Sequence, residues 1–198
     1  MAAISKETIC NRALSLIKAN ATVSNLTTDT TTEAKLCREH FDESLEAVLE
    51  MHQWNFAEVQ AECALSVDAP VLGYDYKHQL PTNPYCLVVR YVEDNSESEV
   101  LAYKIRGRFI ESDSERVFIT YTSKVDNLTE TSTLFRQCLE FYLATKFAEP
   151  IMHSSDVANK MERAFYKMLR KAQKLDSQQG TYKAEEDSDY EWITARYS

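Results

Sequence analysis

The chain has 198 residues, of which 44% are hydrophobic and 27% are charged, as is usual for a folded globular protein. The formal net charge of -9 argues against a protein whose whole surface binds nucleic acid. The three glycines, Gly73, Gly107 and Gly180, lie too far apart to build a phosphate-binding loop, which excludes nucleotide-binding motifs of that kind. No apolar run approaches the ~20 residues that a membrane-spanning helix needs, so no membrane contact is expected.

The cysteines are widely spaced, at Cys10, Cys37, Cys63, Cys86 and Cys138. No pair of them has the C-x-x-C spacing of a zinc site or a redox motif. We therefore expect buried free thiols that pack as small hydrophobic side chains. The odd number of cysteines and the lack of a secretory signal indicate folding in a reducing cytoplasm.

The first predicted helix runs from Ser5 to about Lys18, with Ser5 as its N-cap. A loop follows from Asn20 to Thr32, because this stretch is rich in Asn, Thr and Ser. A second, longer helix is predicted from Thr32 to His52. Its apolar face recurs in steps of three and four residues, at Ala34, Cys37, Phe41, Leu45, Val48 and His52.

The helical period disappears after Trp54, and β-forming residues take over. Residues Val59 to Val67 can be extended. Three β-rich segments follow, Cys86–Val92, Val100–Tyr103 and Val117–Tyr121. Polar breaks at Asp94–Ser96 and Glu111–Asp113 separate them. We predict a small antiparallel sheet inserted into a helical domain.

Helical spacing returns from about Thr131 to Pro150, where the proline should end or kink the helix. A last helix is predicted to begin with Ser155 or Asp156 as its cap and to reach about Leu175. Its apolar residues are spaced by four and three positions, at Met161, Phe165, Met168, Ala172 and Leu175. This stripe spans only about two to three heptads, so packing within the chain's own bundle is favoured over a coiled coil between chains.

Together these elements predict a mainly helical α+β fold. A helical bundle carries an inserted small antiparallel β-sheet region and an extended C-terminal tail. The bundle is assigned to residues 1–58 and 126–176, the β-rich insertion to 59–125 and the tail to 177–198.

Two charged surfaces are the candidates for binding a partner. The polar face of the last helix is basic, with Lys160, Arg163, Lys167, Arg170, Lys171 and Lys174. The segment after Ser177 is acidic between Glu185 and Glu191, yet it also carries large apolar side chains. Purely solvated tails are poor in aromatic residues, so this segment is expected to order on a partner surface or to fold back on its own domain.

The chain shows no recognisable catalytic or metal-binding motif. The four histidines, His40, His52, His78 and His153, are not spaced as a metal pair, and neither H-E-x-x-H nor G-x-S-x-G occurs. The position of His52 on an apolar face beside Trp54 favours a packed, hydrogen-bonded side chain. We therefore expect no enzyme activity, catalytic residue, cofactor or metal, and a hydrolase with an unrecognised site is the least favoured reading.

Four segments, taken in order, carry a resemblance to a known family. They are Thr8–Leu14; the helix with Ala34, Cys37, Phe41, Leu45 and Leu49 that runs into Trp54–Ala57; the tyrosine-rich Tyr74–Pro81; and the helix Phe135–Ala148, followed by Asp156 and a long terminal helix through Tyr166 and Ala172. In the order and spacing of these segments, the chain from Ile4 to Asp176 resembles the tail tubular protein A family. These proteins are adaptors, or head-completion proteins, of short-tailed bacteriophages.

The resemblance implies a structural virion protein without catalytic residues, assembled as a dodecameric ring beneath the portal. One side of such a ring meets the portal protein and the other the tail tube or nozzle, while DNA passes through the bore without specific binding. The portal or a neighbouring subunit would be bound by the tail residues Tyr182, Tyr190, Trp192, Ile193 and Tyr197 and by the helix residues Lys167, Arg170, Lys171 and Lys174. The protein would belong to the neck of the virion, after folding in the bacterial cytoplasm.

Two alternatives stay open. One is another neck protein of different stoichiometry, such as a plug. The other is a small phage-encoded DNA-associated or regulatory protein that uses the basic last helix. The acidity of the whole chain disfavours direct DNA binding.

Overall fold

The structure, a computed structural model, describes residues 4–94 and 101–179. Four α-helices are present there, α1 (Lys6–Leu16), α2 (Thr32–Glu50), α3 (Thr133–Met152) and α4 (Ser155–Ser177), with two antiparallel sheets between α2 and α3. With 46% helix and 21% strand, the prediction of a mainly helical α+β fold with an inserted antiparallel region is confirmed. The predicted tail lies outside the described residues from residue 180 on. No described helix is long and apolar enough to cross a bilayer.

Each α-helix begins at a hydroxyl side chain that caps it. Ser5, Thr31, Ser132 and Ser154 accept hydrogen bonds from the backbone N–H of Thr8, Ala34, Phe135 and Val157, respectively. Such caps satisfy donors that have no partner inside the helix, and each is worth about 1 kcal/mol. The prediction of Ser5 is confirmed, whereas that of Ser155 or Asp156 is wrong. Ser154 takes the role because its backbone is extended, and Asp156 lies in the first turn, where the helix dipole favours a carboxylate.

An aromatic-rich core holds the helices together. Trp54 is fully buried, and its indole N–H donates to the carbonyl of Val48 over 3.0 Å. Its ring packs edge-on against Phe135 of α3, with the ring centroids 5.1 Å apart. The predicted apolar face of α2 is confirmed, because Ala34, Cys37, Phe41, Leu45 and Val48 are buried, while His52 just beyond the helix is half-buried.

α3 continues for two residues beyond Pro150 and ends at Met152. The proline therefore lies in the last turn, where its missing N–H removes only one bond of the ladder. His153 follows in the left-handed conformation, with a φ of 48°, and its N–H donates to the carbonyl of Glu149 over 3.0 Å. This left-handed residue ends the helix and reverses the chain toward α4.

α4 packs against α3, and its buried apolar residues are spaced by four and three positions, at Met161, Phe165, Leu169 and Ala172. The predicted packing within the chain's own bundle is confirmed. The predicted stripe is wrong at Leu175, which is 48% exposed, whereas Met168 is half-buried and still packs against the main core. A straight α-helix has about 3.6 residues per turn, so a strict seven-residue repeat drifts away from the buried face.

The strands form two antiparallel sheets, where the sequence predicts one. The first sheet contains β1 (Glu58–Glu62), β7 (Phe118–Ser123) and β4 (Cys86–Glu93), with β7 in the middle. The second contains, in order, β2 (Ala64–Leu65), β3 (Tyr76–Gln79), β6 (Phe109–Ser112) and β5 (Tyr103–Arg106). Residues of both sheets, among them Ile110, Ile119 and Tyr121, share a second, smaller core.

Strands β3 and β6 are absent from the sequence prediction, and the polar break placed at 111–113 is wrong because β6 runs to residue 112. Both strands bury polar side chains that find partners elsewhere. Nε2 of His78 lies 3.0 Å from the carbonyl oxygen of Ser114, and Glu111 lies 3.1 Å from Nη1 of Arg106. Buried polar residues whose partners lie outside their own strand give a loop-like pattern, which explains the error.

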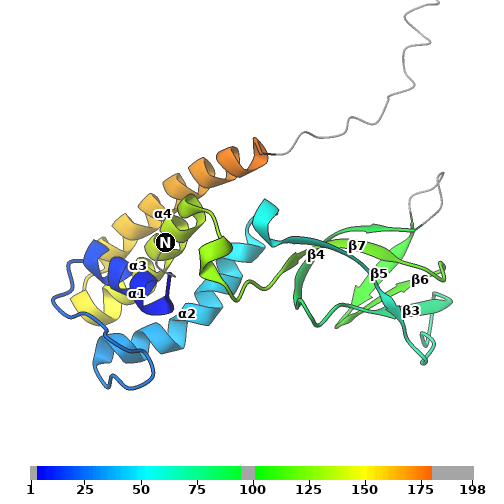
Figure 1. The fold of residues 1–198 in the computed structure, drawn as a ribbon, viewed down its shortest axis with the longest axis horizontal. Coiled ribbons are helices and arrows are strands. Elements are labelled where there is room, and N and C mark those ends of the chain that lie inside the picture. Colours follow the sequence, from blue (N-terminus) through cyan, green and yellow to red (C-terminus); the bar gives the residue numbers. More distant parts are fainter. Residues whose placement is uncertain (1–3, 95–100, 180–198) are drawn as a thin grey trace, which may run out of the picture.

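The molecule is elongated, with the helices at one end and the strands at the other (Figure 1). Arg90 of β4 connects the two parts, because its guanidinium donates to the carbonyls of Glu50 and His52, each over 3.0 Å. Carbonyls at the end of a helix have no partner inside it, so this contact satisfies them. Lys124 adds an ion pair of 2.6 Å with Glu46 of α2. The domain boundaries at residues 58 and 126 stay a prediction.

Candidate partner-binding surfaces

The basic residues of α4 form one continuous stripe on the side of the helix opposite its buried face. With 3.6 residues per turn, they fall within an arc of about 100°. They are Lys160, Arg163, Lys167, Arg170, Lys171 and Lys174, and we call this set the basic stripe. All six are exposed, and among residues 4–94 and 101–179 none has a carboxylate within ion-pair distance. The four predicted partner-binding residues of this helix therefore do lie together.

Two large apolar side chains border the basic stripe, one on each side. Tyr166 is 49% exposed and Leu175 is 48% exposed. Of the three carboxylates of α4, Asp156 lies in the first turn, Glu162 lies outside the arc and Asp176 is buried. The exposed side of α4 thus combines unpaired cations with apolar borders, a chemistry that fits an acidic segment with aromatic side chains.

The end of α4 is anchored on the segment that follows α2. Asp176 is 5% exposed, and its Oδ2 accepts the backbone N–H of Asn55 over 3.1 Å. The side-chain amide of Asn55 donates in return to the backbone carbonyl of Asp176 over 2.6 Å. The chain therefore leaves α4 from a fixed point at the end of the helix.

The predicted tail residues Tyr182, Tyr190, Trp192, Ile193 and Tyr197 lie outside the described residues. Their role in binding a partner stays a prediction. Of the residues predicted to bind a partner, the structure describes only the four on α4, Lys167, Arg170, Lys171 and Lys174.

The connection between β2 and β3 exposes three apolar side chains. The exposed fractions are 103% for Val67, 95% for Val71 and 77% for Leu72, and we call these three residues the apolar loop. The loop lies at the end of the strand region away from the helices (Figure 1). Clustered exposed apolar side chains are typical of surfaces that become covered by a partner. This loop is absent from the sequence predictions, although the Val71-Leu72 pair between Pro70 and Gly73 places apolar side chains in a turn.

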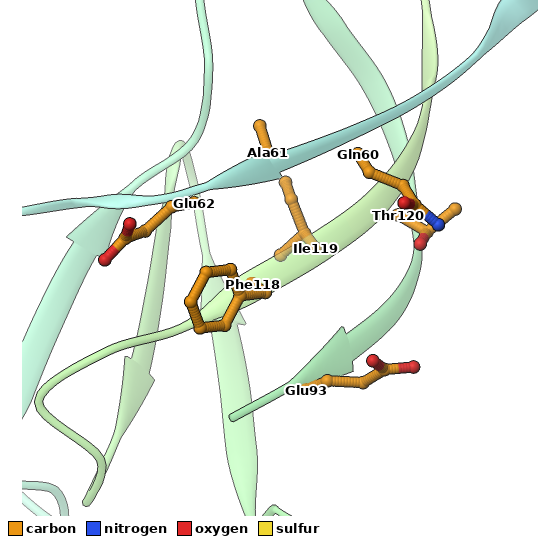
Figure 2. A pocket seen from close by; sticks show the side chains of 7 residues that line it. All are labelled: Gln60, Ala61, Glu62, Glu93, Phe118, Ile119 and Thr120. Carbon is orange, nitrogen blue, oxygen red and sulfur yellow. The ribbon is translucent and has the colours of Figure 1, made fainter. Parts of the chain in front are cut away.

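A shallow groove of about 370 Å³ crosses the exposed face of the first sheet (Figure 2). Glu62, Phe118 and Glu93 are register partners on three adjacent strands, so they line it together. The two carboxylates point in opposite directions in Figure 2. Arg116 donates two hydrogen bonds to Glu62, over 2.8 and 3.0 Å, and lowers its pKa. A general acid needs a raised pKa, so Glu62 is arranged as an ion-pair partner of Arg116.

The buried ionisable groups occupy structural positions. Glu140 of α3 is buried and lies 3.1 Å from Nη1 of Arg12, and burial raises its pKa while Arg12 partly offsets that effect. The five cysteines are free and buried, as predicted. Burial raises the pKa of Cys63 to about 11 and that of Cys138 to about 12, which keeps both thiols protonated at neutral pH.

The histidines do not belong to any cluster of possible metal ligands in the described part of the chain. Nowhere among the described residues do three His, Cys, Asp or Glu side chains gather as a metal site would require. His52 packs against Trp54 as predicted, with the ring centroids 4.9 Å apart. The predicted hydrogen bond is wrong for Nε2, which lies 3.3 Å from Asp176 without hydrogen-bond geometry. This contact is electrostatic, and it operates only when the imidazole is protonated.

No family model matches the sequence, and no curated protein is significantly similar to it. The family suggested by the order of the sequence segments therefore stays a prediction.

Proposed function

We propose that the chain is a structural adaptor of a short-tailed bacteriophage. It would be one subunit of a ring that joins the portal protein to the tail tube or nozzle and lets DNA pass through its bore. The observation that carries this proposal is the pair of exposed surfaces of different chemistry on one elongated molecule. The basic stripe lies on the helical part and the apolar loop lies at the far end of the strand region. A protein that joins two partners needs two such surfaces.

The sequence resemblance supports the same function. Its first two segments fall in α1 and at α2, its third covers β3, and its last covers α3 and α4. The groove on the first sheet adds no catalytic arrangement, since its carboxylates diverge and one of them is bound by Arg116. These surfaces are therefore suited to binding a partner and not to catalysing a reaction.

Attachment through a ring would follow from multivalency. Each subunit presents the same modest surface, and once one copy is bound the next binds at a high effective concentration. Contacts between neighbours in a closed ring join two different patches of the subunit, which suits a molecule with unlike ends. Many weak contacts then hold the head and tail together durably.

The test is the mass of the assembly formed when the purified full chain is mixed with the portal protein of the same phage, measured by native mass spectrometry. We expect a discrete gain of many copies, with a copy number that matches a closed ring, and no such assembly without portal. A chain that is folded by circular dichroism and adds no mass to the portal would overturn the proposal.

The basic stripe also favours a second candidate, a DNA-associated regulatory protein. Six exposed cations without ion-pair partners could neutralise several phosphates, and each neutralised phosphate releases counterions. Binding to duplex DNA would then weaken steeply as salt rises, with a slope set by the number of contacts. A flat or absent salt dependence would remove this candidate.

A further inference from the structure

The basic stripe is an exposed helix face with no partner among the described residues, although the chain as a whole is acidic. Like charges are concentrated along most of α4, because the stripe begins at Lys160 in the second turn and ends at Lys174 in the last. Unpaired cations this close together repel one another, so an anionic partner along the stripe would lower the free energy. The basic stripe is therefore a positively charged surface of defined length with an exposed apolar side chain on each side.

The segment that follows α4 has the complementary composition. Five carboxylates, Glu185, Glu186, Asp187, Asp189 and Glu191, occur within seven residues. Tyr190, Trp192 and Ile193 alternate with and follow them. Tyr166 and Leu175 on α4 are exposed apolar side chains of the kind that such residues contact. The segment is thus opposite in charge to the basic stripe, and both carry large apolar side chains.

We propose that residues 182–197 of the chain bind the basic stripe of their own α4, and so cover it until a partner displaces them. This inference goes beyond the adaptor function and does not rest on it. The acidic residues would pair with Lys167, Arg170, Lys171 and Lys174, and the aromatic residues would lie against Tyr166 and Leu175.

Chain length allows this arrangement. Glu185 is eight residues beyond Ser177, and eight extended residues span at most about 28 Å. Lys167 lies ten residues before Ser177, which is about 15 Å along the helix axis. The acidic residues can therefore double back over the last three turns of α4, and the anchor at Asp176 keeps their starting point beside these turns.

The chain's own segment also has a concentration advantage over a separate partner. A short connection gives an effective concentration in the millimolar range, so even weak ion pairs are populated. Exposed pairs are individually weak and are screened by salt, so the contact should loosen at high ionic strength. A contact of this strength covers the stripe and still yields to a partner that binds at many points.

Tryptophan fluorescence provides the test, because the chain has only Trp54 and Trp192. Trp54 is fully buried, so quenching of the full-length chain by acrylamide, a neutral quencher, reports on Trp192. We compare the wild type with a K167E/R170E/K171E/K174E variant and with a peptide of residues 181–198. A matched control, K18E/K35E/K104E/K146E, changes the net charge equally at exposed lysines outside α4.

We expect weak quenching in the wild type and in the control, and a severalfold increase, toward the value of the peptide, in the stripe variant. A salt concentration of 1 M should raise wild-type quenching in the same direction. A second variant, E185Q/E186Q/D187N/D189N/E191Q, leaves α4 intact and should release Trp192 as well, so the test does not depend on the folding of the stripe variant. Circular dichroism checks each fold.

Three outcomes would overturn the proposal. The first is equal quenching of the wild type and both variants. The second is protection of Trp192 that grows with protein concentration, which would assign the contact to a second copy. The third is wild-type quenching that matches the free peptide while duplex DNA binds the stripe with steep salt dependence, which would make the stripe a nucleic-acid surface.

Discussion

Asp176 and Asn55, which are 121 residues apart in the sequence, exchange two hydrogen bonds that fix the end of α4 to the segment after α2. The carboxylate of Asp176 accepts the backbone N–H of Asn55, and its backbone carbonyl accepts the side-chain amide. The carboxylate is 6% exposed, so it is a buried anion held by hydrogen bonds and by proximity to His52. This contact positions the start of the segment that we propose to bind the basic stripe.

The first prediction concerns this contact. An Asp176→Ala substitution leaves the N–H of Asn55 without its acceptor and should lower the free energy of unfolding by about 1–3 kcal/mol. Asp176→Asn keeps an acceptor oxygen and should lose less. Urea denaturation followed by circular dichroism measures both. The exposed Glu162→Ala on the same helix is the control and should change little; an equal loss in all three variants would contradict the role given to Asp176.

The second prediction concerns Arg90, which links β4 to the end of α2 and also donates to the hydroxyl of Thr122 over 2.9 Å. Arg90→Ala removes donors from the carbonyls of Glu50 and His52 and should cost about 1–2 kcal/mol of unfolding free energy. Arg90→Lys should recover little, since an ammonium group cannot reproduce the planar fork of donors. Denaturation curves measure the loss, with the exposed Arg163→Ala as the control. A lysine variant as stable as the wild type would show that charge alone suffices.

The third prediction tests the apolar loop as a contact surface of the proposed adaptor. Val67→Ser, Val71→Ser and Leu72→Ser, combined in one variant, remove apolar side chains that are largely exposed in the monomer. Stability should therefore stay within about 0.5 kcal/mol of the wild type. Attachment to one of the two partners, the portal or the tail tube, should be lost in a mass measurement of the mixed proteins. Unchanged attachment to both would exclude the loop from either interface.

The helices could be predicted from the sequence because their signals are local. Ser5 caps α1, and the buried face of α2 follows the three- and four-residue spacing of its apolar side chains. The basic stripe could be predicted for the same reason, since helical spacing alone places its six residues on one face. Each of these signals relates residues that lie only three or four positions apart.

The features that escaped prediction depend on partners outside their own helix or strand. His78 and Glu111 look like loop residues until Ser114 and Arg106 are placed beside them. Asp176 reads as a surface carboxylate at the end of a helix, but Asn55 makes it a buried one. The apolar loop was missed for a different reason, since nothing local distinguishes a covered apolar side chain from an exposed one.

The last prediction concerns the pH dependence of stability and Glu140. Burial raises its pKa in the folded chain, so between the unfolded and folded pKa values the folded chain binds more protons than the unfolded chain. The contribution of Glu140 to stability should therefore fall as pH rises through this window, from the ordinary value of a glutamate upward, and stay constant above it. Glu140→Gln cannot ionise, so it should match the wild type near pH 4 and be more stable than the wild type at neutral pH.

Substitution of Arg12 tests the same effect more directly. Its guanidinium lies 3.1 Å from the Glu140 carboxylate and offsets part of the rise in pKa that burial causes. Arg12→Ala should raise the pKa of Glu140 further and steepen the loss of stability with pH, since the buried charge loses its partner. In the Arg12→Ala/Glu140→Gln double variant the added slope should vanish. Urea denaturation from pH 4 to pH 8 measures these slopes, with the exposed Glu39→Gln as the control. A Glu140→Gln variant that is destabilised more at neutral pH than at pH 4 would show that the pair with Arg12 outweighs burial.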